Sequence, residues 1–359
     1  MKEKFLSRQQ LDLLPERILM AEETDASKHL NVYLWRLFEE NGFNPMNILV
    51  VGTGGSYPAA VFAKYALQEE IRTPNIEAVT PQTAIRMITQ FNHISNCTWH
   101  PKYDLVIGIS YSGKTPDIHA VYELCHKKGY PFILLTGAEK SALTGLYEEN
   151  EIISYFNPND TTGKEKSMIS MMSTLAPIII LDDNWTCKLT ELNQKALTEA
   201  QAFVSKINIE EIAYSLKKCP VIHVFYEWDT FATAADIESK FIESGIANVV
   251  LHEKKNFSHG RSTSLYKQEF ALVINLTRND SQYDVDLSKF LSALCYSKFT
   301  DYLEIGNNSF STKDWNIRSL AILPYLITAI GEELNIDIAK PLKPYPNEAL
   351  TLYNYKGFF

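Results

Sequence analysis

Residues Asp104–Pro116, D-L-V-I-G-I-S-Y-S-G-K-T-P, decide the fold that the sequence predicts. The run Leu105–Ile109 is short, apolar and rich in β-branched residues, which is typical of a buried parallel strand. A helical pattern with one apolar face begins after Pro116. Hydroxyls, a glycine and a lysine therefore lie between a strand end and a helix start, where backbone N–H groups and the helix dipole favour an anion such as phosphate. The alternative is an ordinary turn with a Ser/Thr cap.

The length and composition exclude several classes of protein. The 359 residues are enough for two α/β domains, and the net charge of −9 comes without a basic run that would bind nucleic acid or an anionic membrane. Five scattered cysteines without a C-x-x-C pair indicate reduced thiols in a cytoplasmic protein, not zinc or redox motifs. The N-terminus lacks the apolar core of a signal peptide, and the apolar stretch Met168–Leu181 is too short to span a bilayer.

Strand patterns alternate with helical ones, which indicates right-handed βαβ crossovers and parallel sheets covered on both faces. Ligands bind such sheets beyond the carboxyl ends of the strands, where the loops after Val51 and Ile109 are expected. The predicted strands cover residues 47–51, 76–79, 105–109, 131–136, 151–156, 220–226, 247–252, 270–276 and 301–305. Predicted helices include residues 7–21, 27–41, 141–150, 188–207, 230–244, 288–296 and 317–334, with 253–261 as a loop.

The α/β pattern occurs twice, so the chain is predicted to hold two similar halves. The expected division is an N-terminal helical segment at 1–45, a first α/β domain at 46–187, a linking helix at 188–212, a second α/β domain at 213–336 and a C-terminal tail over the site at 337–359.

The first glycine loop, Gly52-Thr53-Gly54-Gly55-Ser56, can be interpreted in two ways. A dinucleotide-binding loop needs a third glycine for close helix–strand packing, and Tyr57 stands in its place, so a nicotinamide or flavin cofactor is disfavoured. The alternative is that Gly54, Gly55 and Ser56 let the backbone approach a sugar phosphate.

A second group of chemically active residues lies in the second half. Lys240 and Glu243 are three positions apart, so they share one helix face. A glutamate near a helix C-terminus opposes the dipole, and burial would raise its pKa further, which suits a general base. His259 follows in a glycine-containing loop. A solvated helix pair and a hydrogen-bonding loop histidine are the alternatives.

These motifs resemble the sugar isomerase (SIS) domain family. G-T-G-G-S-Y and S-Y-S-G-K-T are similar to its two ligand loops, and Glu243 precedes His259 and its glycine by 16 positions, as in the isomerase half of glucosamine-6-phosphate synthase. The resemblance covers nearly the whole chain. It implies two tandem SIS-like three-layer α/β/α domains with parallel sheets, that is, flavodoxin-like sandwiches.

The resemblance also implies a role for each matching residue. Glu243 would move a proton between adjacent sugar carbons, His259 would assist ring opening in its own or a neighbouring subunit, and Lys240 would stabilise the enediol oxygen. No metal or cofactor is implied, and a homodimer is expected. The implied phosphate ligands are Ser110, Ser112 and Thr115 with the main chain of Tyr111 and Gly113, and the sugar would contact Gly54, Gly55 and Ser56.

Some positions depart from the family pattern. Lys166 and Ser167 are only a loose counterpart of its T-K-x-x-T loop, Arg261 replaces the proline after histidine–glycine, and Lys340-Pro341-Leu342-Lys343 replaces its R-N-L-A-K tail. No glutamine amidotransferase domain precedes the motifs, so use of glutamine is not expected. These departures indicate a different substrate.

Three functions remain open from the sequence. The first is a phosphosugar isomerase acting on a phosphorylated sugar or amino sugar, with or without loss of an amino group. The second is a deglycase that splits a fructose–amino acid 6-phosphate adduct, in which Arg261 would meet the amino acid carboxylate. The third is a non-catalytic regulatory protein that binds a sugar phosphate.

Overall fold

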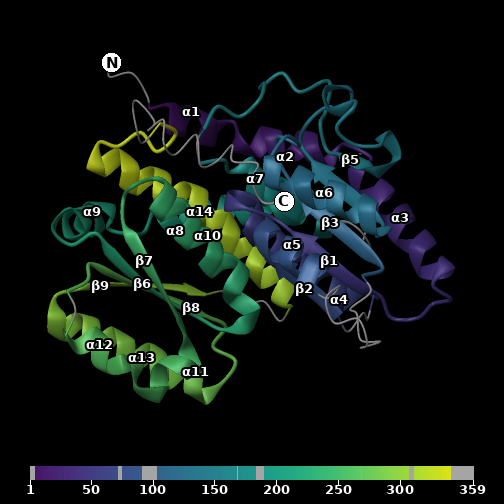
Figure 1. Ribbon diagram of the computed structural model, residues 1–359. Helices are drawn as coiled ribbons and strands as arrows, with labels where there is room; N and C mark the ends of the chain where they lie inside the picture. Colours follow the sequence, from purple (N-terminus) through teal and green to yellow (C-terminus); the bar gives the residue numbers. More distant parts are fainter. Residues whose placement is uncertain are drawn as a thin grey trace. The chain divides into compact units, whose positions relative to one another are not determined.

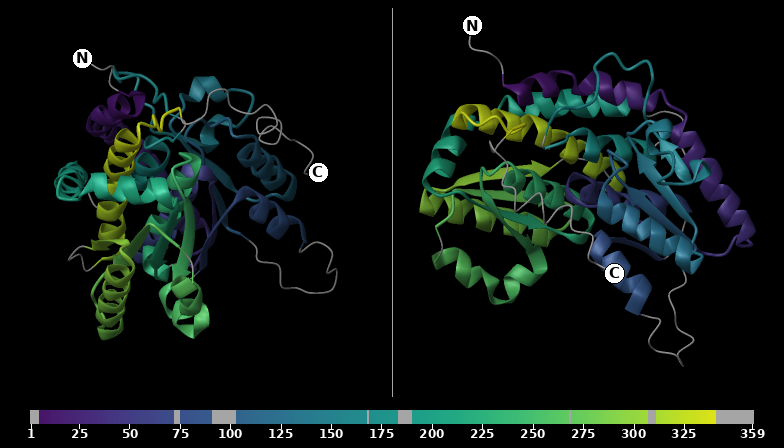
Figure 2. Two further views of the ribbon diagram at one scale, coloured as in Figure 1. Left: turned by 90° about the vertical axis from the view of Figure 1, so that its left-hand side faces the viewer. Right: turned by 45° about the horizontal axis from the view of Figure 1, so that its top comes forward.

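The computed structural model describes residues 5–71, 75–90, 103–167, 169–182, 190–267, 269–306 and 311–340. The chain divides into two compact units, each built on its own parallel sheet with helices on both faces (Figures 1 and 2). The first-sheet unit contains residues 16–163 and 172–182 within the described ranges, and the second-sheet unit contains residues up to 15, 164–171 and 190–340. The predicted fold class is confirmed.

The first-sheet unit has five parallel strands in the order β2-β1-β3-β4-β5. Strands β3 and β4 are buried along their whole length because helices cover both faces. The chain leaves β1 toward one side of the sheet and reaches β3 on the other, so the order reverses between these two strands. The strands are β1 (Asn47–Val51), β2 (Asn75–Val79), β3 (Leu105–Ile109), β4 (Phe132–Thr136) and β5 (Ile152–Ser154).

The helices of this unit pack as two groups: α4 contacts α7 and α3 also contacts α7, whereas α5 contacts α6. A core of aliphatic and aromatic side chains joins α5 and α6 to the sheet, with Val106, Phe132 and Leu134 fully buried. Helix α7 is buried at every residue. The helices are α2 (Leu14–Glu22, whose first two residues belong to the other unit), α3 (Ala26–Glu40), α4 (Tyr57–Ile71), α5 (Pro81–Gln90), α6 (Pro116–Lys128) and α7 (Met172–Asp182).

The second-sheet unit has four parallel strands in the order β7-β6-β8-β9, which reverses between β6 and β8. One face carries α10 and α14, with α8 and α9 packed on α14, and the other carries α13 over a core that includes Phe225, Phe257 and Leu291. The strands are β6 (Val221–Tyr226), β7 (Asn248–Glu253), β8 (Leu272–Thr277) and β9 (Asp301–Gly306). The helices are α1 (Leu6–Asp12), α8 (Thr190–Val204), α9 (Ile209–Lys218), α10 (Phe231–Glu243), α11 (Lys254–Asn256), α12 (Ser262–Lys267), α13 (Gln282–Lys298) and α14 (Thr312–Leu334).

Four local predictions were wrong. The helix predicted at 7–21 is split into α1 and α2 just before Pro15, which cannot donate a backbone hydrogen bond. The helix predicted at 141–150 is two short 3₁₀ turns, because Gly145 between them takes a φ of +81°. The helix predicted at 188–207 ends at Val204, and the separate helix α9 begins after Asn208, whose side chain caps it.

The fourth error concerns the segment predicted as a loop at 253–261, which is helical after Glu253 except at His259 and Gly260. The Glu253 carboxylate accepts hydrogen bonds from the backbone N–H groups of Lys255 (3.2 Å) and Asn256 (3.1 Å), and so starts a helical turn. Residues Phe257–Arg261 continue it to a kink at Gly260. The predicted tail beyond Lys340 lies outside the described residues.

Candidate functional site

The reversal of strand order in the first sheet brings two predicted loops together. Strands β1 and β3 are neighbours, paired as far as Val51 and Gly108, and each continues into its loop at the carboxyl edge of the sheet. The loops Gly52–Ser56 and Ser110–Thr115 therefore flank the crevice at which ligands bind in open α/β sheets. The predicted glycine loop and phosphate loop are thus placed side by side.

The phosphate loop is held by its own hydroxyls. The Ser110 and Thr115 side-chain oxygens are hydrogen-bonded at 2.8 Å, and the Ser110 Oγ also accepts the backbone N–H of Gly113 at 3.1 Å. The Ser112 Oγ accepts the backbone N–H of Lys114 at 3.2 Å. Ser110 is only 2% exposed, whereas Ser112 and Thr115 are partly exposed. Ser110 therefore shapes the loop, and Ser112 and Thr115 are better placed to contact a ligand.

The capping explanation of this loop is not supported. Thr115 is the N-cap residue of α6, but its side chain makes no capping hydrogen bond. Its hydroxyl turns back to Ser110 instead. Because the first backbone N–H groups of a helix have no partner within the helix, the start of α6 keeps its capacity to bind an anion.

Strand β4 anchors the loop, through residues that the sequence analysis did not single out. The Tyr111 carbonyl accepts hydrogen bonds from the backbone N–H of Gly137 (3.2 Å) and from the Thr136 hydroxyl (3.3 Å). A Cβ atom on Gly137 would lie 2.7 Å from the Tyr111 ring. Gly113 has a φ of +65°, and a Cβ atom there would lie 2.8 Å from Leu143. The Thr-Gly pair directly after a buried strand was the available sequence signal.

The glycine loop forms a tight 3₁₀ turn at Gly54–Ser56. Gly54 has a φ of +52°, and the Gly55 carbonyl accepts a 2.7 Å hydrogen bond from the Thr174 hydroxyl of α7. Ser56 is 5% exposed. Main-chain groups of this loop, more than the Ser56 hydroxyl, are therefore presented to the crevice.

In the second-sheet unit, α10 carries Lys240 and Glu243 near its end. Lys240 is 2% exposed, and its ammonium forms an ion pair with the carboxylate of Asp236, one turn earlier. Glu243 is half-buried, and Oε1 accepts a 2.7 Å hydrogen bond from the Ser239 hydroxyl. Burial raises the pKa of Glu243, while the Ser239 hydrogen bond and the Lys240 charge act to lower it.

His259 and Arg261 lie at the other edge of the second sheet from Glu243. Glu243 ends α10 just before β7 begins, whereas both residues follow the end of β7, and Figure 1 shows β7 running between α10 and α11. Six residues of strand span about 20 Å. His259 and Arg261 are exposed, in the helical segment kinked at Gly260. The structure therefore brings His259 and Arg261 together, but not with the Glu243 of the same chain.

Lys166 and Ser167 belong to the second-sheet unit. Lys166 is exposed, with its backbone N–H bound to the Gln10 side chain at 2.9 Å, and the Ser167 hydroxyl donates to the Ile169 carbonyl at 2.8 Å. Buried Glu165 orders this segment by accepting the backbone N–H of Met171 at 2.8 Å. Neither Lys166 nor Ser167 shares a unit with the phosphate loop.

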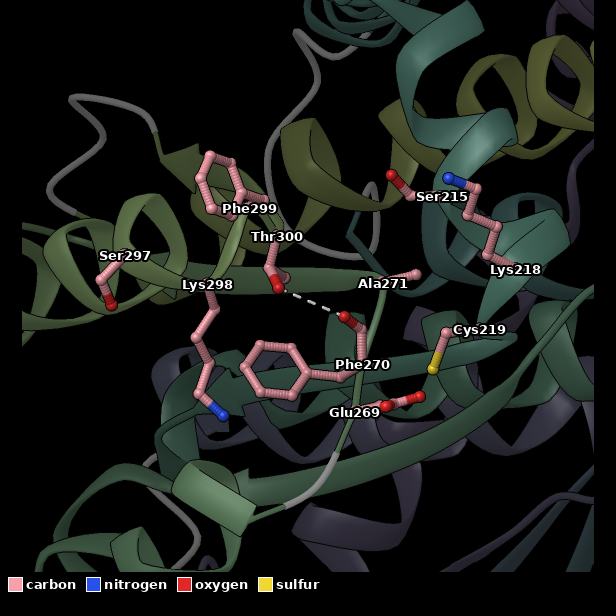
Figure 3. Close-up of a pocket in the computed structure, with 10 residues that line it drawn as sticks. All are labelled: Ser215, Lys218, Cys219, Glu269, Phe270, Ala271, Ser297, Lys298, Phe299 and Thr300. Atoms are coloured by element: carbon pink, nitrogen blue, oxygen red, sulfur yellow. Dashed lines mark hydrogen bonds between the residues drawn. The ribbon is translucent and has the colours of Figure 1, made fainter.

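A cavity of about 420 Å³ lies at the amino ends of the second-sheet strands (Figure 3). The Thr300 hydroxyl donates to the Phe270 carbonyl in this cavity, and Lys298 donates to the carbonyls of Leu265 and Tyr266. None of the predicted site residues lines it. It therefore does not contribute to the candidate site.

The described residues contain neither a metal-binding cluster nor a membrane-spanning helix. No three His, Cys, Asp or Glu side chains gather where they could hold a metal ion in this part of the chain. Within the same ranges, every helix is too short or too polar to cross a membrane.

Comparison with known proteins gives a family match for the first domain and a fold match for nearly the whole chain. Residues 43–182 match the model of the SIS domain, while no curated protein matches the sequence. Three solved structures share the fold at low sequence identity. A protein from Silicibacter pomeroyi, proposed to be a phosphosugar isomerase, has a TM-score of 0.68 at 16% identity, over 93% of this chain and 100% of that one.

The other two are enzymes of phosphorylated sugars. The C-terminal domain of glucosamine-fructose-6-phosphate aminotransferase from Francisella tularensis has a TM-score of 0.64 at 17% identity, over 92% of this chain and 97% of that one. The tagatose-6-phosphate ketose/aldose isomerase from Escherichia coli has a TM-score of 0.65 at 16% identity, over 92% and 93%. Residues 43–182 of this chain therefore match the SIS domain, as the sequence predicted, and the solved structures share the fold over nearly the whole chain.

Proposed function

We propose that this protein is a phosphosugar enzyme that moves a proton between adjacent carbons of a phosphorylated sugar or amino sugar, as an aldose–ketose isomerase does. The observation that carries the proposal is Glu243, a half-buried carboxylate whose pKa is raised by burial and which has one oxygen held in place. A base with a pKa shifted toward the working pH is what such proton transfer requires.

The phosphate loop supports the substrate class. A phosphate would bind at the N-terminus of α6, where backbone N–H groups and the helix dipole favour negative charge. The hydroxyls of Ser112 and Thr115 would donate to its oxygens. Gly54 and Gly55 would let the main chain lie against the sugar, because no side chain intervenes.

The reaction needs no redox change. Glu243 takes the proton from the carbon next to the carbonyl, the C–H electron pair forms the double bond of an enediol, and the carbonyl oxygen takes a proton from solvent. Glu243 then returns its proton to the neighbouring carbon while the hydroxyl on the first carbon gives its proton to solvent and becomes the new carbonyl, which yields the isomeric sugar. The ammonium of Lys240 forms an ion pair with Asp236. In this mechanism Lys240 therefore lowers the pKa of Glu243 through its charge and does not bind the sugar directly.

A role for His259 in the reaction would require a second copy of the chain. Because about 20 Å of strand separates it from the Glu243 of its own chain, the two cannot act on one sugar ring within one chain. If both take part in the reaction, a second copy must supply His259, and the enzyme is a homodimer.

Glu243→Gln tests the proposal. Wild-type protein is incubated in D₂O with fructose 6-phosphate, tagatose 6-phosphate and glucosamine 6-phosphate, and NMR follows product formation and deuterium uptake at the reacting carbon. The Glu243→Gln variant should bind the same sugar in a thermal-shift assay and lose turnover by at least about a thousandfold. Glu210→Gln, an exposed change on α9, is the matched control and should keep the wild-type rate. Turnover by Glu243→Gln at the wild-type rate would refute the mechanism.

Arg261 favours a second candidate, a deglycase. It is exposed two residues after His259, where its guanidinium would meet the carboxylate of an amino acid joined to the sugar. Release of free amino acid from a fructose–amino acid 6-phosphate adduct would establish this activity, and ammonia release from glucosamine 6-phosphate would indicate a deaminase. Binding of a sugar phosphate without turnover of any of these compounds would indicate a regulatory protein.

A further inference from the structure

Ser239 stands out because of where its hydroxyl points. Serine in the middle of a helix commonly bonds back to the carbonyl four residues earlier. In α10 the Ser239 hydroxyl instead donates forward to Oε1 of Glu243, at 2.7 Å. The two residues are four positions apart and therefore share one face of the helix.

No other side chain among the described residues donates a hydrogen bond to the Glu243 carboxylate. Lys240, the nearest cation, directs its ammonium at Asp236. The last torsion of a glutamate side chain otherwise has a broad, roughly two-fold distribution. The single bond from Ser239 therefore distinguishes the two oxygens, because Oε1 accepts it and Oε2 does not.

We infer that Ser239 is a positioning residue, which holds Oε1 of Glu243 so that Oε2 is the oxygen that takes and returns the substrate proton. The inference rests on the proposed role of Glu243 as the base. Proton transfer requires the accepting oxygen to lie within hydrogen-bond reach of the carbon-bound proton in a defined direction. A carboxylate that rotated freely would spend part of its time with neither oxygen aligned.

The same hydrogen bond has an electrostatic consequence. Burial favours the neutral acid and raises the pKa of Glu243, whereas the Ser239 hydroxyl stabilises the carboxylate and lowers it. Ser239 thus helps keep the base ionised. Removing the hydroxyl is expected both to misalign the carboxylate and to move the acid limb of the pH–rate profile to higher pH.

Ser239→Ala and Ser239→Thr test the inference. With whichever of the three sugar phosphates named above shows Glu243-dependent turnover, Ser239→Ala should lower kcat by about fivefold or more, a change expected for one lost hydrogen bond to a charged group. KM should change little, since the phosphate is bound elsewhere. The acid limb of the pH profile of kcat/KM should move to higher pH. Ser239→Thr, which keeps the hydroxyl, should restore both kcat and the wild-type position of this limb.

A readout without substrate separates this inference from the proposed function. Protein labelled with ¹³C at the glutamate carboxyl carbons is titrated by NMR, and the Glu243 signal is identified as the one missing in Glu243→Gln. Its midpoint should rise in Ser239→Ala and return in Ser239→Thr. An unchanged midpoint and an unchanged kcat in Ser239→Ala, with Glu243→Gln inactive, would overturn the role of Ser239 and leave the base intact. An active Glu243→Gln would overturn the proposed function itself.

Discussion

Subunit complementation is the most direct test of how Glu243 and His259 cooperate. The perturbation is a pair of inactive variants, Glu243→Gln and His259→Asn, produced in one cell with different affinity tags. Each homodimer lacks one of the two groups at both of its sites. The strand geometry predicts that mixing restores activity, because about 20 Å of β7 separates the two groups within a chain.

The expected magnitude follows from counting sites. Random association makes about half of the dimers mixed, and in a mixed dimer one site receives both the intact Glu243 and the intact His259, so the rate per chain should be about a quarter of wild type. The purified doubly tagged dimer should reach about half of the wild-type rate. If both groups served one site in the same chain, every site of the mixture would lack one of them, and no activity would return.

A second mixture inverts the outcome and serves as the control. The double variant Glu243→Gln/His259→Asn is produced together with wild type. If sites are shared between chains, both sites of a mixed dimer are inactive, and the purified mixed dimer should show only background. If sites lie within one chain, that dimer should keep about half of the wild-type rate. Activity in this dimer, with none in the first mixture, would refute the shared-site proposal.

Three further predictions concern the loop and the stability of the fold. Gly137→Ala should weaken binding of inorganic phosphate by more than about tenfold, because its Cβ atom would displace the Tyr111 ring and with it the phosphate loop, while circular dichroism stays native. His223 and His252 are buried and hydrogen-bonded to each other at 2.7 Å, and burial lowers both pKa values to about 4. The unfolded chain binds protons first as pH falls below 6.5, so the free energy of unfolding in urea should drop by about 2 kcal/mol per histidine from pH 7 to pH 5, and a double leucine variant should lose this dependence. Phe299 is 98% exposed with a φ of +55° at the end of α13, so Phe299→Gly should raise the free energy of unfolding by about 1 kcal/mol.

The first sheet was predictable because its signals are local. Val106 and Ile107 lie in an apolar run bounded by Asp104 and by a hydroxyl-rich turn, and such a run forms a buried strand wherever helices cover both faces. The turn Ser110–Thr115 was predictable for the same reason, since the turn and the following helix are adjacent in sequence. Its anchors were not, because Thr136 and Gly137 reach Tyr111 across 25 and 26 positions of chain.

The sequence predicts the hydrogen-bonding partners of Lys240 and Glu243 but does not predict how far these residues are buried. Asp236 and Ser239 each stand four positions before the residue they bind, which is the spacing of neighbours on a helix. The sequence could not say that Lys240 is buried, because burial on α10 depends on elements that pack against it from elsewhere in the chain, such as α14. To predict where His259 lies, one must know the direction in which β7 runs. The spacing of 16 residues between Glu243 and His259 does not give that direction.

The two sheets differ in what occupies the crevice at which strand order reverses, and this difference explains why only one is expected to bind phosphate. In the second sheet the Asp284 carboxylate, in the first turn of α13, accepts hydrogen bonds from Lys254, from the Thr277 hydroxyl and from the backbone N–H of Asn279 at 3.0 Å. Asp284 is 2% exposed. Burial acts to raise the pKa of its carboxyl group, but the ion pair with Lys254 keeps that pKa low.

The chain thus carries its own anion at this helix N-terminus, where an incoming phosphate would meet a like charge and donors already engaged. In the first sheet the loop Ser110–Thr115 supplies hydroxyls, and the first turn of α6 has its one acidic residue, Asp117, outside the bonds that shape the loop. Two units of one architecture therefore differ in chemistry: in one the helix start is expected to bind an external anion, and in the other a buried carboxylate of the chain takes the same position.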